Sequence, residues 1–409
     1  MSKKLQREIE AIVAQLPRKF VKDLIREKLV EAGLEPKEAL LEQLTAHVLS
    51  GGKDEVTWEE SGEKDFTLTF TDEDLDSIDR KLTAFTEKKL PKLVEEVTET
   101  GARELLKTLR RNWPDRDLWE KQARRTFEER LEQRWAEPLA LLRMLLTISR
   151  EIGEERSAKL ARSRAKRNRH RNEVLCRLHA RACQVSEEIV HLLAGGFADG
   201  AMARWRTLHE IGVVVALIAE HGDELAETYL AHEAVESKRG LHTYMATYEQ
   251  LGYKPLSKRE IKRVEKSLAD GIAKYGTQFK NEYGWAAKIL KNPNPRFAYL
   301  EAAAGRARMR SHYKMASHNV HAGVKGITHR LGLLAGSRIM LAGASNAGLD
   351  EPGQNTAITL TQITFALFGP RWPIDDLVML KAISGLRDKA VQAFVRTGRR
   401  LDREGKAQP

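Results

Sequence analysis

The sequence predicts an all-α protein in which a charged N-terminal helical region is followed by a C-terminal helical bundle. Charged residues make up 31% of the 409 residues and aromatic residues only 6%, a balance that favours helices over a β-rich fold. Apolar residues recur at intervals of three and four through most of the chain, which is the period of an amphipathic helix. A chain of this length can form two or three domains, each with its own core.

The first part of the chain is predicted to form helices and one extended segment. Residues 1 to 50 show helical spacing in LQREIEAIVAQL and KEALLEQLTAHVL, and the second run stops at a glycine pair. In DFTLTFTDEDL, apolar residues alternate with threonines, which predicts a lone short strand or an extended arm near residues 66–70. Thr71, followed by acidic residues, is expected to begin the next helix.

Residues 73 to 155 are predicted as charge-rich helix, interrupted near NWPDRD and containing the apolar stretch EPLALLRMLLTISREIG. The strongly basic segment ERSAKLARSRAKRNRHR follows. We place a boundary here, between an N-terminal region of residues 1–155 and a bundle domain of residues 156–409. The basic segment is interpreted as a phosphate-binding stripe or as the solvated start of a helix. In the first case its nucleic-acid-binding residues are Arg164, Arg167, Arg169 and Arg171.

The bundle domain is predicted from a series of helical runs. Residues 172–240 contain two of them, separated by AGGFADG, in which Asp199 is expected to cap the second helix. Ser257, with Glu260 three residues later, has the pattern of a capping box at the start of a further helix. GASNAGLDEPGQNTA is expected to be a long loop before two final helices.

Net charge and cysteine spacing limit the classes of function. The formal net charge of +11 indicates an anionic partner, nucleic acid first, or a merely basic surface. Cys176 and Cys183 lie roughly 10 Å apart along a helix, too far for a disulfide, which fits reduced thiols. The longest apolar run, residues 211–219, is shorter than the roughly 20 residues that a spanning helix needs. We therefore expect a cytoplasmic protein with no membrane partner.

Two histidines in YKMASHNVHAG form a candidate site. On a helix, His318 and His321 are one turn apart and face the same side, and Asn319 lies about 100° away. Two imidazoles in this arrangement can share a proton-transfer step, coordinate a metal ion or hold a phosphate. A polar helix end with two surface histidines is the structural alternative. The prediction includes no cofactor and no metal.

A second polar group lies in ARWRTLHEIGVVV, immediately before an apolar run. Arg206 and Glu210 are four residues apart there, so they share one side of a helix. They can form a simple intrahelical ion pair, which contributes little where it is exposed. Alternatively, they can orient a histidine that arrives from another helix.

Several stretches, in one order along the chain, resemble a bacterial family known as domain of unknown function 5677. The resemblance covers roughly residues 100 to 400. The stretches that carry it are LLAGGFADGAMARWRTLHEIGVVVALI, YLAHEAVES, LGYKPLSKREI, YGWA, YKMASHNVHAG and GASNAGLDEPGQNTA. The resemblance implies a helical fold that is distantly similar to HEPN domains, many of which are metal-independent ribonucleases in toxin–antitoxin and phage-defence systems. The HEPN signature, an arginine and a later histidine with four to six residues between them, matches three pairs: Arg204 with His209, Arg164 with His170 and Arg306 with His312.

Charge and resemblance together predict an RNA-binding protein that acts as a metal-independent endoribonuclease in stress or phage defence. In this scheme Arg206 meets His318 or His321 across two helices. The arginine stabilises the charge on the phosphorane, the histidine moves the proton of the ribose 2′-hydroxyl, and Glu210 and Asn319 orient them. The alternatives are a non-catalytic module that binds a protein partner and a sensor of a small ligand. We also expect a homo-oligomer.

Overall fold

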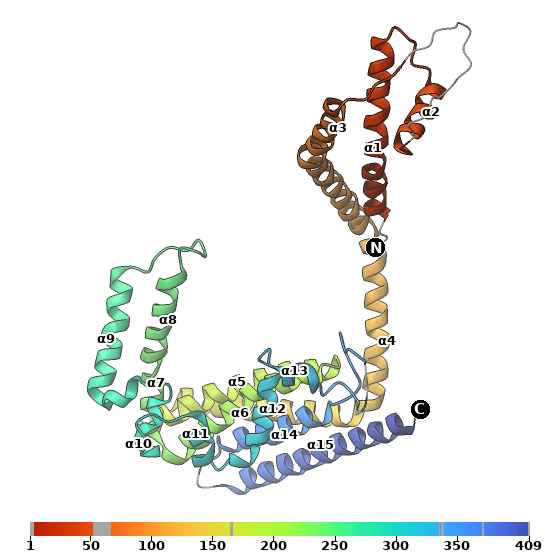
Figure 1. The fold of residues 1–409 in the computed structure, drawn as a ribbon. Coiled ribbons are helices and arrows are strands. Elements are labelled where there is room, and N and C mark those ends of the chain that lie inside the picture. The colour runs from red at the N-terminus through yellow and green to blue at the C-terminus, as the bar shows by residue number, and fades with distance from the viewer. Residues whose placement is uncertain are drawn as a thin grey trace. The chain divides into compact units, whose positions relative to one another are not determined.

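In the computed structural model of the protein, the described residues are 4–51, 67–163, 167–334, 336, 339–369 and 372–407. Their regular structure is helical and includes no strand, which confirms the predicted all-α class (Figure 1). No helix within these ranges is both long enough and apolar enough to cross a membrane. The thiols of Cys176 and Cys183 are both free, as their spacing predicts.

The chain folds as two compact units, Met1–Glu120 and Lys121–Pro409. The division falls inside the helix α4 (Leu90–Arg162), earlier in the chain than the boundary predicted after residue 155. The apolar stretch of α4 accounts for the difference, because side chains such as that of Leu142 are completely buried in the core of the second unit. The basic segment therefore lies inside the second unit and not at its beginning.

The first unit contains α1 (Lys4–Glu31), α2 (Glu38–Leu49) and α3 (Asp72–Ala84), followed by a π-helical turn, η1 (Phe85–Lys89). As predicted, α3 begins at Thr71, whose hydroxyl accepts a hydrogen bond from the backbone N–H of the third helical residue in a capping box. The hydrophobic core cluster of this unit comes from α1 and α2 and contains Val21, Ile25, Leu29, Leu40, Leu41 and Leu44.

The strand considered near residues 66–70 is not formed over residues 67–70. Residues 67–70 have no regular secondary structure, and Phe66 lies outside the described residues. Leu68 and Phe70 pack against the core of α1 and α2. Their alternation with threonines therefore reflects a segment that lies on a helical core, with no partner strand in the described part of the chain to pair with it.

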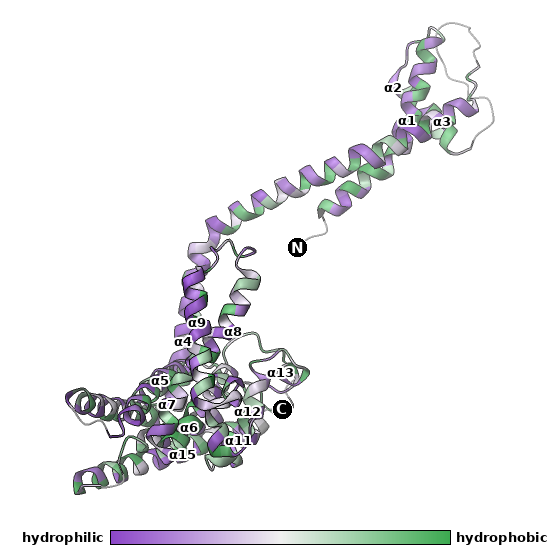
Figure 2. Ribbon diagram, turned by 90° about the vertical axis from the view of Figure 1, so that its left-hand side faces the viewer, coloured by the Kyte–Doolittle hydropathy of each residue, from purple (hydrophilic) through white to green (hydrophobic). Residues whose placement is uncertain are grey.

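Helix α4 continues through NWPDRD without the predicted interruption, although it contains Pro114. A proline removes one backbone hydrogen bond, and this exposed position in a long helix tolerates the loss. The departure from helical geometry comes later, at Trp135, with φ −104° and ψ 15°. Hydrophilic and hydrophobic residues alternate along the N-terminal part of α4 (Figure 2). The large apolar side chains exposed there are Val94, Leu105, Leu106, Leu109, Trp113, Leu118 and Trp119.

The second unit is a bundle built on α5 (Arg169–Ala194), α6 (Ala198–His221), α14 (Asp350–Phe365) and α15 (Ile374–Ala407). Helix α14 packs against the other three, and α5 packs against α6. Figure 1 shows α8 and α9 side by side as a pair that projects from this bundle. The elements between α6 and α14 are α7 (Asp223–Ala231), α8 (Glu233–Thr247), α9 (Lys258–Tyr275), η2 (Thr277–Lys280), η3 (Gly284–Ala286), α10 (Ala287–Leu290), α11 (Phe297–Ala303), η4 (Ala307–Met309), α12 (Arg310–His318) and α13 (Val324–Thr328).

Helix α14 begins inside the stretch that was expected to be a loop. Its first turn contains Pro352, a position at which proline removes no helical hydrogen bond. The helix is buried although it is rich in threonine, because each buried hydroxyl donates to a carbonyl four residues earlier. The Thr359 hydroxyl also accepts a hydrogen bond from Trp205 Nε1 at 3.1 Å, which joins α14 to α6. Pro352 and Gly353, which suggested a loop in this stretch, therefore lie in the first turn of a helix.

His179 is buried in the same core, where only 2% of its surface is exposed. Its Nε2 lies 3.1 Å from the Thr364 hydroxyl of α14. On the other side, Gly153 leaves no space for a side chain, since a Cβ there would lie 2.6 Å from the imidazole Nδ1. Burial lowers the pKa of His179 to about 4, so the ring is neutral in the folded protein near pH 7.

Acid is expected to destabilise the second unit in part through His179. The pKa of His179 is 6.5 when exposed and about 4 in the folded protein. The stability that its neutral form contributes to folding is therefore complete above pH 6.5 and is lost as the pH falls towards 4. At pH 4 the loss amounts to about 3 kcal/mol. The variant His179→Gln cannot take up this proton, so its free energy of unfolding, measured in urea, should fall by about 3 kcal/mol less between pH 6.5 and 4. An equal fall in both proteins would contradict this account.

Candidate functional site

The predicted pair on α6 forms a closed network with a tyrosine of α12. Arg206 Nη2 donates to the Tyr313 hydroxyl at 2.9 Å, and that hydroxyl donates to Glu210 Oε1 at 2.7 Å. Arg206 Nε lies 3.2 Å from the same Glu210 oxygen, and the guanidinium lies 4.8 Å from the Tyr313 ring centroid. Burial and the bond to Glu210 raise the pKa of Tyr313, so its hydroxyl keeps its proton.

A buried histidine–carboxylate contact lies next to this network. His209 Nε2 is 2.9 Å from Glu301 Oε1 of α11, and both side chains are 1% exposed. The other oxygen of Glu301 accepts a hydrogen bond from Arg310, the first residue of α12. Burial lowers the pKa of His209 although Glu301 opposes the shift, so a neutral imidazole donates to the carboxylate. The charge of Glu301 is therefore balanced mainly by Arg310, which attaches α12 to α11.

The predicted histidines line a separate hollow of about 370 Å³ where α12 ends. His318 and Asn319 are half-buried there, and His321 is exposed. The hollow is also lined by Asp199, from the first turn of α6, and by Arg330, which follows α13. Its volume falls within the range of sites that bind small molecules or single nucleotides.

Asp199 holds Arg330 at this hollow. Its carboxylate accepts from Arg330 Nε at 2.9 Å through one oxygen and from the backbone N–H of Leu331 at 2.9 Å through the other. Asp199 is therefore not the predicted helix cap; the cap position of α6 is Phe197, which makes no side-chain cap bond. With Nε occupied by Asp199, the guanidinium has other N–H groups to offer to an anion in the hollow.

A close backbone approach shapes the loop that carries His321. At Gly326, a Cβ would lie 2.4 Å from the carbonyl oxygen of His318, so only glycine fits there. The N–H of His321 donates to the Ser317 carbonyl at 3.1 Å, which continues the direction of α12 by one turn. His318 is the last residue of α12 and His321 lies after the helix, and both line the hollow together with Arg330.

The structure thus separates the five predicted catalytic residues into two groups. Arg206 and Glu210 bond to Tyr313, whereas His318, Asn319 and His321 line the hollow. Within the described part of the chain, no contact joins one group to the other, so the predicted meeting of Arg206 with a histidine is not observed. The hollow contains a different arginine, Arg330, which the sequence did not suggest because it lies 131 residues from its partner Asp199.

The basic segment is divided between exposed and bonded residues. Arg167 and Arg169 are exposed, while Arg164 lies outside the described residues. Arg171 is half-buried: its backbone N–H donates to Asp223 Oδ1 at 2.9 Å and its side chain to Asn172 Oδ1 at 3.2 Å. The nucleic-acid-binding role of the four arginines stays a prediction, and Arg171 also contributes to the junction of α5 and α7.

The HEPN-type pairs with both members described take part in internal contacts. Arg204 bonds to Glu188 of α5, while its partner in the signature, His209, is buried beside Glu301. Arg306 bonds to Gln362 of α14, and burial lowers its pKa to about 10. Its signature partner, His312, faces Glu351 at 2.7 Å. Neither pair lines the hollow. Among the residues that the structure describes, no cluster of three or more His, Cys, Asp or Glu has an arrangement suited to a metal ion.

Residues 172–337 match the model of a family described as a family of unknown function (DUF5677). The matched segment begins in α5, ends after α13 and includes both polar groups described above. The predicted resemblance is therefore confirmed over this narrower range. No curated protein and no solved structure matches the chain. The relationship to HEPN domains stays a prediction.

The network on α6 predicts which residues are energetically coupled. A double-mutant cycle with Arg206→Ala and Tyr313→Phe should show coupling of about 1 kcal/mol, because each change removes the same hydrogen bond. The matched cycle with Arg206→Ala and His321→Ala should be additive within about 0.5 kcal/mol, because these side chains make no contact. Urea unfolding provides both values. Coupling of Arg206 to His321 but not to Tyr313 would restore the arrangement that the sequence predicted.

Proposed function

We propose that the protein binds RNA and cleaves it without a metal ion at the hollow formed by His318, Asn319, His321 and Arg330. The observation that carries this proposal is that two histidines, an amide and an arginine line one hollow of about 370 Å³. Acid–base cleavage of RNA needs this set of groups: a proton acceptor, a proton donor and a fixed positive charge.

In the proposed reaction, one histidine accepts the proton of a ribose 2′-hydroxyl while the oxygen attacks the adjacent phosphorus. The bond from phosphorus to the 5′-oxygen then breaks, and the other histidine donates a proton to that leaving oxygen. Arg330 stabilises the negative charge that develops on the phosphorane, and Asp199 positions its guanidinium. Asn319 offers amide groups to the substrate. The products are a 2′,3′-cyclic phosphate and a 5′-hydroxyl.

Arg330 takes the place that the sequence suggested for Arg206. The Arg206 guanidinium is 24% exposed and bonded to both Glu210 and Tyr313, so this network acts in the proposal as the joint between α6 and α12. We place the enzyme in the cytoplasm, in stress or phage defence. The net charge of +11 supports an RNA substrate because it favours association with a polyanion.

A non-catalytic interaction module is the second candidate, and one observation favours it. Helix α4 exposes Leu105, Leu109 and Trp113 in its N-terminal part, and neighbouring large apolar side chains on a surface are typical of interaction sites. The expected homo-oligomer belongs to this candidate as well as to the enzyme. Sedimentation velocity of the purified chain measures its oligomeric state directly.

The catalytic proposal predicts cleavage of a labelled RNA pool by the purified protein in the presence of a chelator. His318→Ala and His321→Ala should each reduce the cleavage rate by a factor of about 100 or more, since general acid–base catalysis typically contributes that much. The rate should pass through a maximum as pH rises, because one histidine must be neutral and the other protonated. A substrate with 2′-deoxyribose at every position should resist cleavage.

The matched control is His329→Ala, which changes an exposed histidine that bonds to Thr328 and does not line the hollow. It should cleave like the wild type, and the melting temperature of His321→Ala should change little because that side chain is exposed. Equal cleavage by all variants would mean that these histidines take no part. No cleavage by the wild type under any condition would favour the interaction module.

A further inference from the structure

Helices α8 and α9 form a hairpin that projects from the bundle, with exposed basic residues along α9 and exposed aromatic and apolar residues at its tip. The two helices pack against each other, and Lys238 of α8 pairs with Glu265 of α9 at 2.8 Å. Helix α9 begins at the capping box of Ser257 and Glu260, as predicted. The Tyr244 hydroxyl donates to the carbonyl of Lys254 at 2.8 Å, which fixes the connecting segment. The hairpin therefore presents a defined surface.

One face of α9 is a row of cations. At about 100° per residue, five of its exposed lysines and arginines fall within an arc of about 140°, opposite its half-buried apolar residues. Lys258, Lys262 and Lys266 follow one another at steps of about 6 Å along the axis. In the described chain no ion pair engages any member of this row, which we call the α9 cationic face: Lys258, Arg259, Lys262, Arg263 and Lys266.

The acidic residues of α9 offset this face only in part, through the electrostatic interaction of Glu260 with Arg263. Glu260 bonds to Ser257 as part of the capping box, and Glu265 points to Lys238 of α8. Asp270 is exposed and falls within the same arc, one turn beyond Lys266. Long basic side chains without acidic partners are well suited to contact a chain of phosphates, since each contact releases a counterion.

Aromatic and apolar side chains are exposed at the tip of the hairpin, next to the start of this face. Tyr253 and Leu251 are each 60% exposed. The Tyr253 ring is nearly parallel to that of Tyr244, with an angle of 8° and 6.4 Å between centroids, and Tyr244 is followed by Tyr248 at 6.2 Å. A tyrosine held in this way presents a π-face on which an unstacked base can lie.

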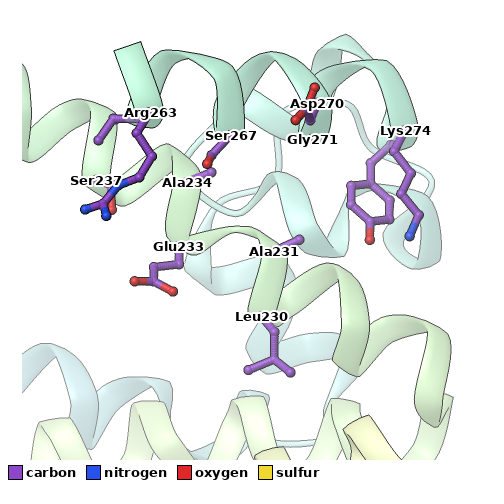
Figure 3. A pocket seen from close by; sticks show the side chains of 12 residues that line it. Leu230, Ala231, Glu233, Ala234, Ser237, Arg263, Ser267, Asp270, Gly271 and Lys274 are labelled. Atoms are coloured by element: carbon purple, nitrogen blue, oxygen red, sulfur yellow. The ribbon is translucent and has the colours of Figure 1, made fainter. Parts of the chain in front are cut away.

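A hollow at the base of the hairpin continues this surface. It measures about 560 Å³ and lies between α7, α8 and α9 (Figure 3). Small side chains leave the space open, among them Ala234 of α8 and Ser267 of α9, and Arg263 stands at its edge (Figure 3). The apolar face of α9 is turned towards α8 and is half-buried, so it is not available for insertion into a lipid surface.

We propose that the α8–α9 hairpin is the surface that holds single-stranded RNA, with the phosphates on the α9 cationic face and a base stacked on Tyr253. Single strands fit better than duplexes because only unpaired bases can stack on an exposed ring. This inference rests on the RNA-binding part of the proposed function and does not depend on cleavage.

The test is fluorescence anisotropy with a labelled single-stranded RNA, in chelator and in the His321→Ala background, so that the RNA stays intact. Reversing three charges with Lys258→Glu, Lys262→Glu and Lys266→Glu should weaken binding by a factor of 100 or more at low salt. The slope of log K against log salt should become shallower by about 2, since each lost phosphate contact on a single strand contributes about 0.7. Tyr253→Ala should weaken binding about tenfold without changing this slope, and Tyr253→Phe should bind like the parent.

The control with the same change in net charge is Arg110→Glu, Arg111→Glu and Arg125→Glu, three exposed positions of α4. It should retain most of the affinity, and a duplex RNA of the same length should bind more weakly than the single strand. Equal losses in both triple variants would overturn the proposal, because net charge alone would then explain binding. Unchanged RNA affinity with a loss of binding to anionic phospholipid vesicles would overturn it too. A hairpin variant that binds RNA as tightly as its parent and still cleaves it would contradict the proposed role of the hairpin. The catalytic proposal would be unaffected.

Discussion

The packing of α6 between α14 and α12 is the constraint on which the second unit depends. On one side Trp205 is completely buried and donates its indole N–H to Thr359. A buried indole N–H needs an acceptor, so α14 has a threonine at this position and not an apolar residue. On the other side Arg206 and Glu210 receive Tyr313 from α12. Because packing in the core fixes α6, its polar side and its first turn, which contains Asp199, also have defined positions. Asp199 lines the hollow, so the position of α6 sets one wall of the hollow.

Buried charge explains why α12 is placed so firmly. Glu301 is 1% exposed, and a carboxylate in such a place is costly unless it is paired. Arg310 supplies the pairing charge from the first residue of α12, and Tyr313 adds a second attachment one turn later. A helix of nine residues measures about 13 Å, so fixing its start also determines where His318 lies at its end. The site is therefore positioned by groups that take no direct part in its chemistry.

Local sequence patterns predicted what depends on neighbours in the chain and missed what depends on distant ones. The helical class, the helix start at Thr71 and the capping box at Ser257 follow from spacing alone. The predicted interruption near Pro114 is not found, because a single proline at an exposed position destabilises a long helix too little to end it. The pairing of Asp199 with Arg330 could not be predicted, since it arises only when the end of α13 folds back on the start of α6.

In the two proposals, the hairpin determines how tightly RNA binds, and the hollow determines how fast the bound RNA is cleaved. Contacts that the hairpin makes with phosphates and bases far from the reacting bond are the same before and during cleavage, so they strengthen binding without lowering the barrier. Contacts of Arg330 strengthen only as charge develops on the phosphorane, so they act on the chemical step. Loss of Lys262 should accordingly raise KM and leave kcat nearly unchanged, whereas Arg330→Ala should lower kcat, which steady-state kinetics separates. The reverse division would mean that the hairpin, and not the hollow, holds the scissile phosphate.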